Sequence, residues 1–250
     1  MEVLAGPHAV YASLDAARRQ VHRVHLRRGR SSRPEIDSIL ALCGQRGVQV
    51  RDASDRELTA LAGTPSHQGI AAEVGSYPLA TTDAMLQAAR AKEELPLLLA
   101  LDGIQDPHNL GAILRSADAV GVHGVILPSD RAARVTPTVS RVSVGAAEYL
   151  LVAQCVNLVR ELERLKAEGL WVVGVEQHPR AQDLWAVGFE MATVLVVGSE
   201  GTGMRRLTVE TCDLLASVPM MGHVSSLNAS VAASLALYAA ARGQGRLETS

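Results

Sequence analysis

The sequence has 250 residues, of which 48% are hydrophobic, and its formal net charge is −2. A chain of this length and composition can bury a core in one large or two small domains, and its slightly acidic balance argues against a general nucleic-acid coat. No window approaches the roughly 18 consecutive apolar residues of a membrane-spanning helix, and the N-terminus lacks the pattern of a secretory signal.

The three cysteines, Cys43, Cys155 and Cys212, lie far apart in the sequence. Their odd number argues against a disulfide framework, and none has the CxxC or His/Cys spacing of a structural zinc site. We therefore expect free thiols, a cytoplasmic protein and no bound metal.

Residues 1–75 are predicted to form a small α/β domain. Ser54 and Glu57 have the spacing of a capping box at the start of a helix, and Pro34 suits the first turn of another. The expected helices are Pro7–Ala17, Pro34–Cys43 and Ser54–Leu61. The expected strands are Val21–Leu26, Val48–Val50 and Gly69–Val74.

A run of basic residues lies within this domain. Between Arg18 and Arg33 there are seven arginines and two histidines but no acidic residue. Such a run suits phosphate binding. It equally suits a solvated helix face and loop, because arginine is the usual cation of this chain. The run alone leaves both interpretations open.

Residues 76–96 are predicted to be a linker with one helix, Thr82–Lys92, and residues 244–250 a flexible tail. Between them, in residues 97–243, apolar strands alternate with helices, which predicts a doubly wound α/β domain with a parallel sheet covered on both faces. The expected strands are Leu97–Leu101, His123–Leu127, Glu148–Val152, Leu170–Val175, Val194–Val197 and Leu214–Val218. The expected helices are Leu110–Val120, Pro137–Ala147, Leu158–Glu168 and Asn228–Arg242.

Polar residues follow three of these strands. Glu200 lies in a glycine loop, Gly198–Gly203, while Ser226 and Asn228 precede the last helix. Taken singly, a loop acid and two helix-capping residues need no function. Because the carboxyl ends of parallel strands share one edge of a sheet, however, their joint placement predicts a ligand site there.

The third strand end is followed by Asn109 and Arg115. Asn109 suits an N-cap, and Arg115 is the one cation in an otherwise apolar helix segment. Six residues are nearly two helical turns, so we expect the two side chains to share one side of the helix. An arginine in this setting must extend to solvent or find a buried acidic partner.

Three segments of the second domain together resemble the motifs of the TrmH-type SPOUT RNA methyltransferases. They are Asp102–Val122 (DGIQDPHNLGAILRSADAVGV), Val196–Met204 (VVGSEGTGM) and Ser217–Ala232 (SVPMMGHVSSLNASVA). Ser199 and Thr202 depart from the family pattern but are not among the polar positions that the family uses.

The resemblance extends to the N-terminal domain. Gly6–Val10 and His67–Ile70 are similar to the substrate-binding domain of the RlmB branch of this family, which has a fold like ribosomal protein L30e. The resemblance implies S-adenosylmethionine-dependent 2′-O-methylation of a ribose in RNA and, for this branch, of a guanosine in 23S rRNA. It also implies a Rossmann-like SPOUT sheet with a C-terminal trefoil knot, and a homodimer.

The resemblance also implies the site residues. The polar active-site positions of the family are matched by Asn109, Arg115, Glu200, Ser226 and Asn228. The cofactor positions, where backbone atoms do most of the binding, are matched by Gly198, Glu200, Gly201, Val218, Pro219, Met220, Ser226, Leu227 and Asn228. Contacts with RNA are expected from Arg18, Arg23, Arg27, Arg28, Arg131, Arg134 and Arg141.

In this family the motif arginine is often assigned as the base that removes the 2′-hydroxyl proton, and Arg115 matches that position. A guanidinium has a pKa above about 12, so binding the adjacent phosphate and polarising the hydroxyl is a second role that fits the same residue.

Three alternatives compete with this assignment. A nicotinamide oxidoreductase would place G-x-G-x-x-G after its first strand, whereas the loop here is G-x-x-G-x-G and lies late in the chain. A non-catalytic RNA-binding protein of the same fold would have no need of the five polar positions together. A methyltransferase acting on tRNA stays within the same class, and the accessory domain favours rRNA by analogy.

Overall fold

A computed structural model describes residues 1–29 and 33–247, which form two compact units. The N-terminal unit consists of Met1–Pro78 together with Val135–Tyr149, and the second unit consists of Leu79–Arg134 and the chain from Leu150 onward. This division differs from the expected one, because most of the predicted linker belongs to the second unit and a piece of the predicted catalytic domain belongs to the first. No helix in the described ranges is long and apolar enough to cross a membrane.

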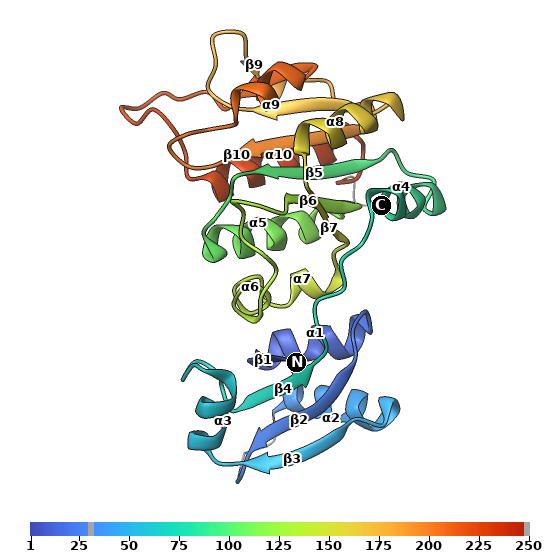
Figure 1. Ribbon diagram of the computed structural model, residues 1–250, viewed down its shortest axis with the longest axis vertical. Coiled ribbons are helices and arrows are strands. Elements are labelled where there is room, and N and C mark those ends of the chain that lie inside the picture. The colour runs from blue at the N-terminus through green and yellow to red at the C-terminus, as the bar shows by residue number, and fades with distance from the viewer. Residues whose placement is uncertain (30–32, 248–250) are drawn as a thin grey trace. The chain divides into compact units, whose positions relative to one another are not determined.

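The N-terminal unit is built on a four-stranded sheet (Figure 1). The strands, in the spatial order β1-β4-β2-β3, are β1 (Glu2–Ala5), β4 (Ile70–Val74), β2 (Val21–Arg27) and β3 (Gln49–Ala53). Its first three helices are α1 (Pro7–Ala16), α2 (Pro34–Arg46) and α3 (Asp55–Ala62). The capping box of Ser54 and Glu57 is present as predicted, whereas β1 was not predicted. Apolar side chains including Leu4, Leu14 and Leu26 form the core.

The segment Val135–Tyr149 forms two short helices, α6 (Pro137–Val142) and α7 (Ala146–Tyr149). The predicted single helix Pro137–Ala147 is interrupted because Val144 and Gly145 adopt positive φ angles of 55° and 86°. A Cβ atom on Gly145 would lie 2.7 Å from Ala12 in α1, so only glycine allows this close packing. The predicted strand Glu148–Val152 is wrong except for its last residue, since Glu148 is helical and buried and the strand begins only at Val152.

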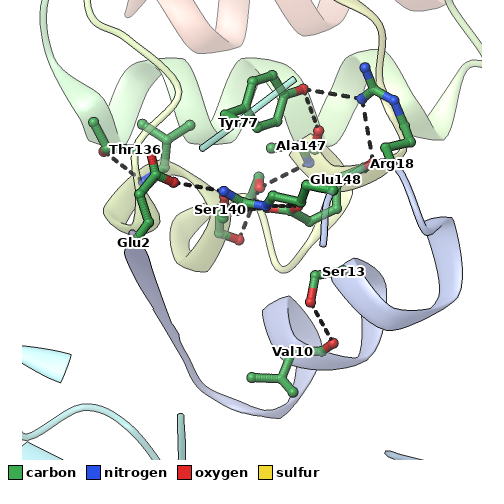
Figure 2. A network of polar contacts seen from close by, with 12 residues as sticks. Glu2, Val10, Ser13, Arg18, Tyr77, Thr136, Ser140, Ala147 and Glu148 are labelled. Atoms are coloured by element: carbon green, nitrogen blue, oxygen red, sulfur yellow. Dashed lines mark hydrogen bonds and ion pairs between the residues drawn. The ribbon is translucent and has the colours of Figure 1, made fainter. Parts of the chain in front are cut away.

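Polar contacts tie this segment into the N-terminal unit. The Arg19 guanidinium forms two bonds with the Glu148 carboxylate, at 2.9 and 2.6 Å, and a third with Glu2 at 2.7 Å. The Ser140 hydroxyl donates to Glu148 at 2.7 Å, and the Tyr77 hydroxyl donates to the Ala147 carbonyl at 2.7 Å (Figure 2). The N-terminal unit is therefore completed by residues from far along the chain, since Tyr77 and Ala147 are 70 positions apart and Arg19 and Glu148 are 129 apart.

The second unit contains a seven-stranded sheet in which every pairing is parallel. Its strands, in the spatial order β7-β6-β5-β10-β8-β11-β9, are β7 (Val152–Cys155), β6 (Gly124–Pro128), β5 (Leu97–Asp102), β10 (Thr193–Gly198), β8 (Trp171–Val175), β11 (Leu214–Ser217) and β9 (Gln182–Asp183). Its helices are α4 (Thr82–Ala91), α5 (Pro107–Ala119), α8 (Leu158–Ala167), α9 (Arg206–Thr211), α10 (Ala229–Gly243) and the short η1 (Leu184–Ala186). The predicted doubly wound α/β architecture is confirmed.

Both faces of this sheet are covered, as the uninterrupted apolar strands predict. β5 and β10 are buried along their whole lengths. Met85 of α4 and Leu162 of α8 pack with Leu98 and Val194 in one buried cluster. The helices α5 and α10 pack against each other. The cysteines are free as predicted, and burial raises the pKa of Cys155 to about 11 and that of Cys212 to about 12, so both thiols are protonated near neutral pH.

The start of the predicted tail is anchored to the second unit. The Gln244 amide donates to the Met191 carbonyl at 2.8 Å. Arg246 donates to the carbonyls of Gly121, at 2.9 Å, and Leu95, and pairs with Glu94 at 2.8 Å. Residues 244–247 are therefore held by hydrogen bonds that the local sequence does not reveal, while residues 248–250 of the predicted tail lie outside the described residues.

His123 lies beside this anchor and is buried. Its Nδ1 accepts a hydrogen bond from the Leu97 amide at 3.1 Å, and its Nε2 lies 3.2 Å from the Glu94 carboxylate. Burial and the neighbouring Arg246 guanidinium lower the pKa of His123 to about 4, and Glu94 offsets this only in part. The histidine is thus neutral in the folded chain at neutral pH.

This histidine should make stability depend on pH. Its pKa falls from 6.5 in its ordinary state to about 4 on folding, so the unfolded chain binds a proton first as the pH falls. The contribution of His123 to the free energy of unfolding is complete above pH 6.5 and is lost between pH 6.5 and 4. The loss at pH 5 amounts to about 2 kcal/mol. We expect the thermal midpoint to fall between pH 7 and pH 5, and to fall less in His123→Asn. An equal fall in both proteins would contradict this assignment.

Candidate functional site

A cavity of about 280 Å³ lies at the carboxyl ends of β8, β10 and β11, where parallel sheets bind ligands. The loops after these strands and the start of α10 line it. The lining residues predicted for cofactor binding are Gly198, Glu200, Gly201, Val218, Ser226 and Leu227. Pro219, Met220 and Asn228, which were also predicted, are not among its lining residues.

The glycine loop is a closed turn in which Ser199 and Gly203 exchange backbone hydrogen bonds of 3.1 and 2.9 Å. A Cβ atom on Gly198 would lie 2.2 Å from the Gly203 carbonyl carbon, and Gly203 itself has a φ of 66°. Both positions therefore require glycine for the loop to fold back on the end of β10. This turn places Glu200 at the mouth of the cavity.

Asn228 connects two other predicted active-site residues, Asn109 and Glu200. Its side-chain oxygen caps α10 by accepting from the Ser230 amide at 2.9 Å. Its side-chain nitrogen donates to Asn109 at 3.0 Å and to Glu200 at 2.9 Å. Residues from the starts of α5 and α10 and from the loop after β10 thus meet at one point of the sheet edge, as the strand-end argument predicts.

Asn109 differs in one respect from its predicted role as an N-cap. α5 begins at Pro107, and the Asp106 carboxylate caps it by accepting from the amides of His108 and Asn109, at 3.1 and 3.2 Å. Asn109 therefore lies in the first helical turn, and its side chain is available for Asn228.

Arg115 and Ser226 do not join this cluster. Arg115 is exposed on α5, and no bond from its guanidinium to Asn109, Glu200 or Asn228 is seen in the described parts of the chain. Six residues turn a helix by about 600°, which places Arg115 about 120° away from Asn109, so the expectation of a shared side was wrong. Ser226 is exposed and lines the cavity.

The lining residues that sequence reasoning missed include Glu176 and Gln177. Glu176 accepts a hydrogen bond from the Met204 amide at 3.2 Å, and Gln177 donates to the Val218 carbonyl at 2.6 Å. Both directly follow β8, so the strand-end argument that selected Glu200 would have selected them too, had it been applied to every strand.

The predicted RNA-binding arginines have different surroundings. The Arg18 guanidinium donates to the Tyr77 hydroxyl at 3.3 Å (Figure 2). It also donates to the Pro78 carbonyl at 3.2 Å, so Arg18 is held within the N-terminal unit and is not a free surface cation. Arg23 pairs with Glu73 at 3.4 Å, and Arg27 pairs with Asp55 at 2.5 Å. The remaining predicted positions are exposed or partly exposed, and they are Arg28, Arg131, Arg134 and Arg141.

The cavity beside the glycine loop, called the first cavity from here on, suits a ligand that carries positive charge and is bound through backbone atoms. Two carboxylates, Glu176 and Glu200, line it together with glycines that allow close approach of the main chain. A sulfonium cofactor such as S-adenosylmethionine has these requirements, because it carries a fixed positive charge next to its methyl group. Within residues 1–29 and 33–247, no three metal-binding side chains lie together.

Comparison with known families agrees with this geometry. The model of the SpoU rRNA Methylase family matches residues 96–238, and the model for RNA 2′-O ribose methyltransferase substrate binding matches residues 3–80. The 23S rRNA (guanosine-2′-O-)-methyltransferase RlmB of Pseudomonas putida is 43% identical over 97% of this chain and 96% of its own.

Two solved structures are also similar. The SpoU methyltransferase AviRb of Streptomyces viridochromogenes, in complex with the cofactor AdoMet, matches with a TM-score of 0.79 and 25% identity, over 96% of this chain and 89% of that one. The A. aeolicus TrmH/SpoU tRNA modifying enzyme matches with a TM-score of 0.56 and 28% identity, over 65% of this chain and 84% of that one.

Proposed function

Because the chain belongs to the SpoU rRNA methylase family, we propose that it transfers a methyl group from S-adenosylmethionine to the 2′-hydroxyl of a guanosine in 23S rRNA. The observation that carries this proposal is the hydrogen-bonded cluster of Asn109, Glu200 and Asn228 beside the first cavity. Bound S-adenosylmethionine supplies an activated methyl group, so the chain's own residues have to align the ribose and remove one proton.

Glu200 is the side chain of this cluster that suits proton removal. An ionised carboxylate accepts protons, and Asn228 fixes one of its oxygens at 2.9 Å. We propose that the Glu200 carboxylate removes the 2′-hydroxyl proton, either directly or through one water. Asn109 and Asn228 position it, and Arg115 binds the adjacent phosphate, because a guanidinium does not give up its proton at neutral pH.

Coverage by the relatives favours rRNA over tRNA as the acceptor. RlmB matches 97% of this chain, whereas the tRNA modifying enzyme matches 65%. The segment that matches the substrate-binding family, residues 3–80, lies in the N-terminal unit. Binding folded rRNA is therefore the role that we propose for this unit, and on the same ground we propose that the protein is cytoplasmic.

A homodimer is proposed as well. Val231 and Tyr238 of α10 are 46% and 47% exposed, and Met221 and Val224 in the preceding loop are 97% and 65% exposed. An apolar surface of this kind is typical of a protein interface. The trefoil knot that the resemblance implies stays a prediction.

The test is transfer of tritium from labelled S-adenosylmethionine to unmodified 23S rRNA and, separately, to unmodified tRNA. We expect label in the rRNA that maps to a 2′-O-methylguanosine. Label in tRNA alone would support methyl transfer to RNA but would contradict 23S rRNA as the acceptor. If neither RNA is labelled although the cofactor binds, the protein is not a methyltransferase for these acceptors.

A further inference from the structure

A second cavity, of about 480 Å³, lies at the same edge of the second unit's sheet, beyond the ends of β6 and β7. It is bounded by Pro128, by residues 156–159 and by residues 205–208. Only β5 lies between β6 and β10 in the sheet, so the ends of β6 and β10 are about 10 Å apart. The chain also enters this cavity at Arg205, two residues after the glycine loop. The second cavity is therefore a neighbour of the first.

Three arginines line the second cavity: Arg131, Arg205 and Arg206. Arg131 is exposed, and the described part of the chain shows no ion pair for it. Arg206 pairs with Glu210 at 2.6 Å but is 78% exposed. The one carboxylate among the lining residues is Asp130, while the carboxylates that pair with Arg205 and Arg206, Asp102 and Glu210, do not line the cavity. Three guanidinium groups therefore reach the cavity wall against one carboxylate.

The buried carboxylate of Asp102 holds Arg205 in place. Asp102, at the end of β5, is fully buried and accepts a hydrogen bond from the Arg205 amide at 2.8 Å. One of its oxygens also lies 3.4 Å from Arg205 Nε, while the Arg205 side chain stays 51% exposed. A surface arginine would otherwise sample many rotamers. Asp102 is thus a positioning residue that keeps one guanidinium at the cavity wall.

The same cavity exposes apolar side chains. Val156 is 89% exposed and Leu207 is 55% exposed, and both line it. Guanidinium groups bind phosphate, and aliphatic side chains cover the less polar parts of a sugar or base. We propose that this cavity binds a nucleotide of the acceptor RNA next to the one that is methylated. This inference rests on the proposed function.

The test compares two variants of the full chain, R131Q/R205Q and R160Q. Arg160 is an exposed arginine of α8 that does not line the cavity, so R160Q controls for loss of positive charge. Binding to an unmodified 23S rRNA transcript is measured without cofactor at several salt concentrations. We expect R131Q/R205Q to bind about tenfold more weakly or worse, with a salt slope smaller by about 1.4, because two phosphate contacts to single-stranded RNA are lost.

R160Q should bind within twofold of the wild type, and all three proteins should bind S-adenosylmethionine equally. Equal RNA binding by R131Q/R205Q and R160Q would overturn the inference. If the wild type binds this RNA but transfers no methyl group, the proposed function fails. The comparison of the variants then still shows whether the second cavity binds RNA. If R131Q/R205Q does not fold, R131Q alone should lower the slope by about 0.7, and an unchanged slope would overturn the inference.

Discussion

Replacing Arg19 with alanine is expected to lower the free energy of unfolding of the N-terminal unit by about 3–5 kcal/mol. The Arg19 side chain is 3% exposed and holds both oxygens of Glu148, which is also 3% exposed. Without the guanidinium, Glu148 keeps only the Ser140 hydroxyl as a hydrogen-bond donor in the described structure. The loss is large because a charge is left buried without its partner.

Arg23→Ala is the matched control for this prediction. Arg23 lies in the same unit and pairs with Glu73 at 3.4 Å, but its side chain is 30% exposed, so its loss should cost less than about 1 kcal/mol. Denaturation followed by circular dichroism measures both variants, and hydrogen exchange should be faster in α1 and α7 of the Arg19 variant. Equal losses for the two variants would show that the buried pair contributes no more than the partly exposed pair of Arg23 and Glu73.

The architecture of the second unit was predictable because its signals are local. Short apolar runs alternate with amphipathic helices, and each run ends in small or polar residues, so the strands and the edge of the sheet where a ligand is expected both follow from the sequence. The same reasoning selected Glu200 and Asn228 as candidate site residues, and the structure brings these two side chains together. Glu176 was within reach of the same reasoning, because it directly follows β8.

Long-range pairing was not predictable. Arg19 and Glu148 lie 129 residues apart, and Arg246 bonds with Leu95 across 151 residues. Nothing in the local sequence distinguishes the buried Arg19 from the exposed Arg28. The sequence therefore supports only an interpretation of the basic run as a whole and does not single out Arg19 as a buried ion-pair partner. For the same reason the sequence places the segment of α6 and α7 in the second domain as one helix, Pro137–Ala147, although Val135–Tyr149 belongs to the N-terminal unit.

Arg115 differs from the other predicted active-site residues, because no polar side chain of the cluster holds it in the described structure. Its position on the exposed side of α5 leaves the guanidinium free to meet an RNA phosphate that approaches from solvent. An arginine that fixes the phosphate next to the acceptor ribose acts mainly by alignment, and misalignment of reacting atoms by about 1 Å can cost 100-fold in rate. This role requires no proton transfer from a group whose pKa exceeds about 12.

Arg115→Ala should therefore lower the rate of methyl transfer by at least about 100-fold. Binding of S-adenosylmethionine should stay within twofold of the wild type, because Arg115 does not line the first cavity. Arg90→Ala is the matched control, since Arg90 is an exposed arginine of α4 whose ion pair with Glu168 is long, at 3.6 Å. Single-turnover transfer to unmodified 23S rRNA and calorimetric titration of the cofactor measure the two quantities. Near-normal turnover of Arg115→Ala would remove this residue from the mechanism, and loss of cofactor binding would make its role structural.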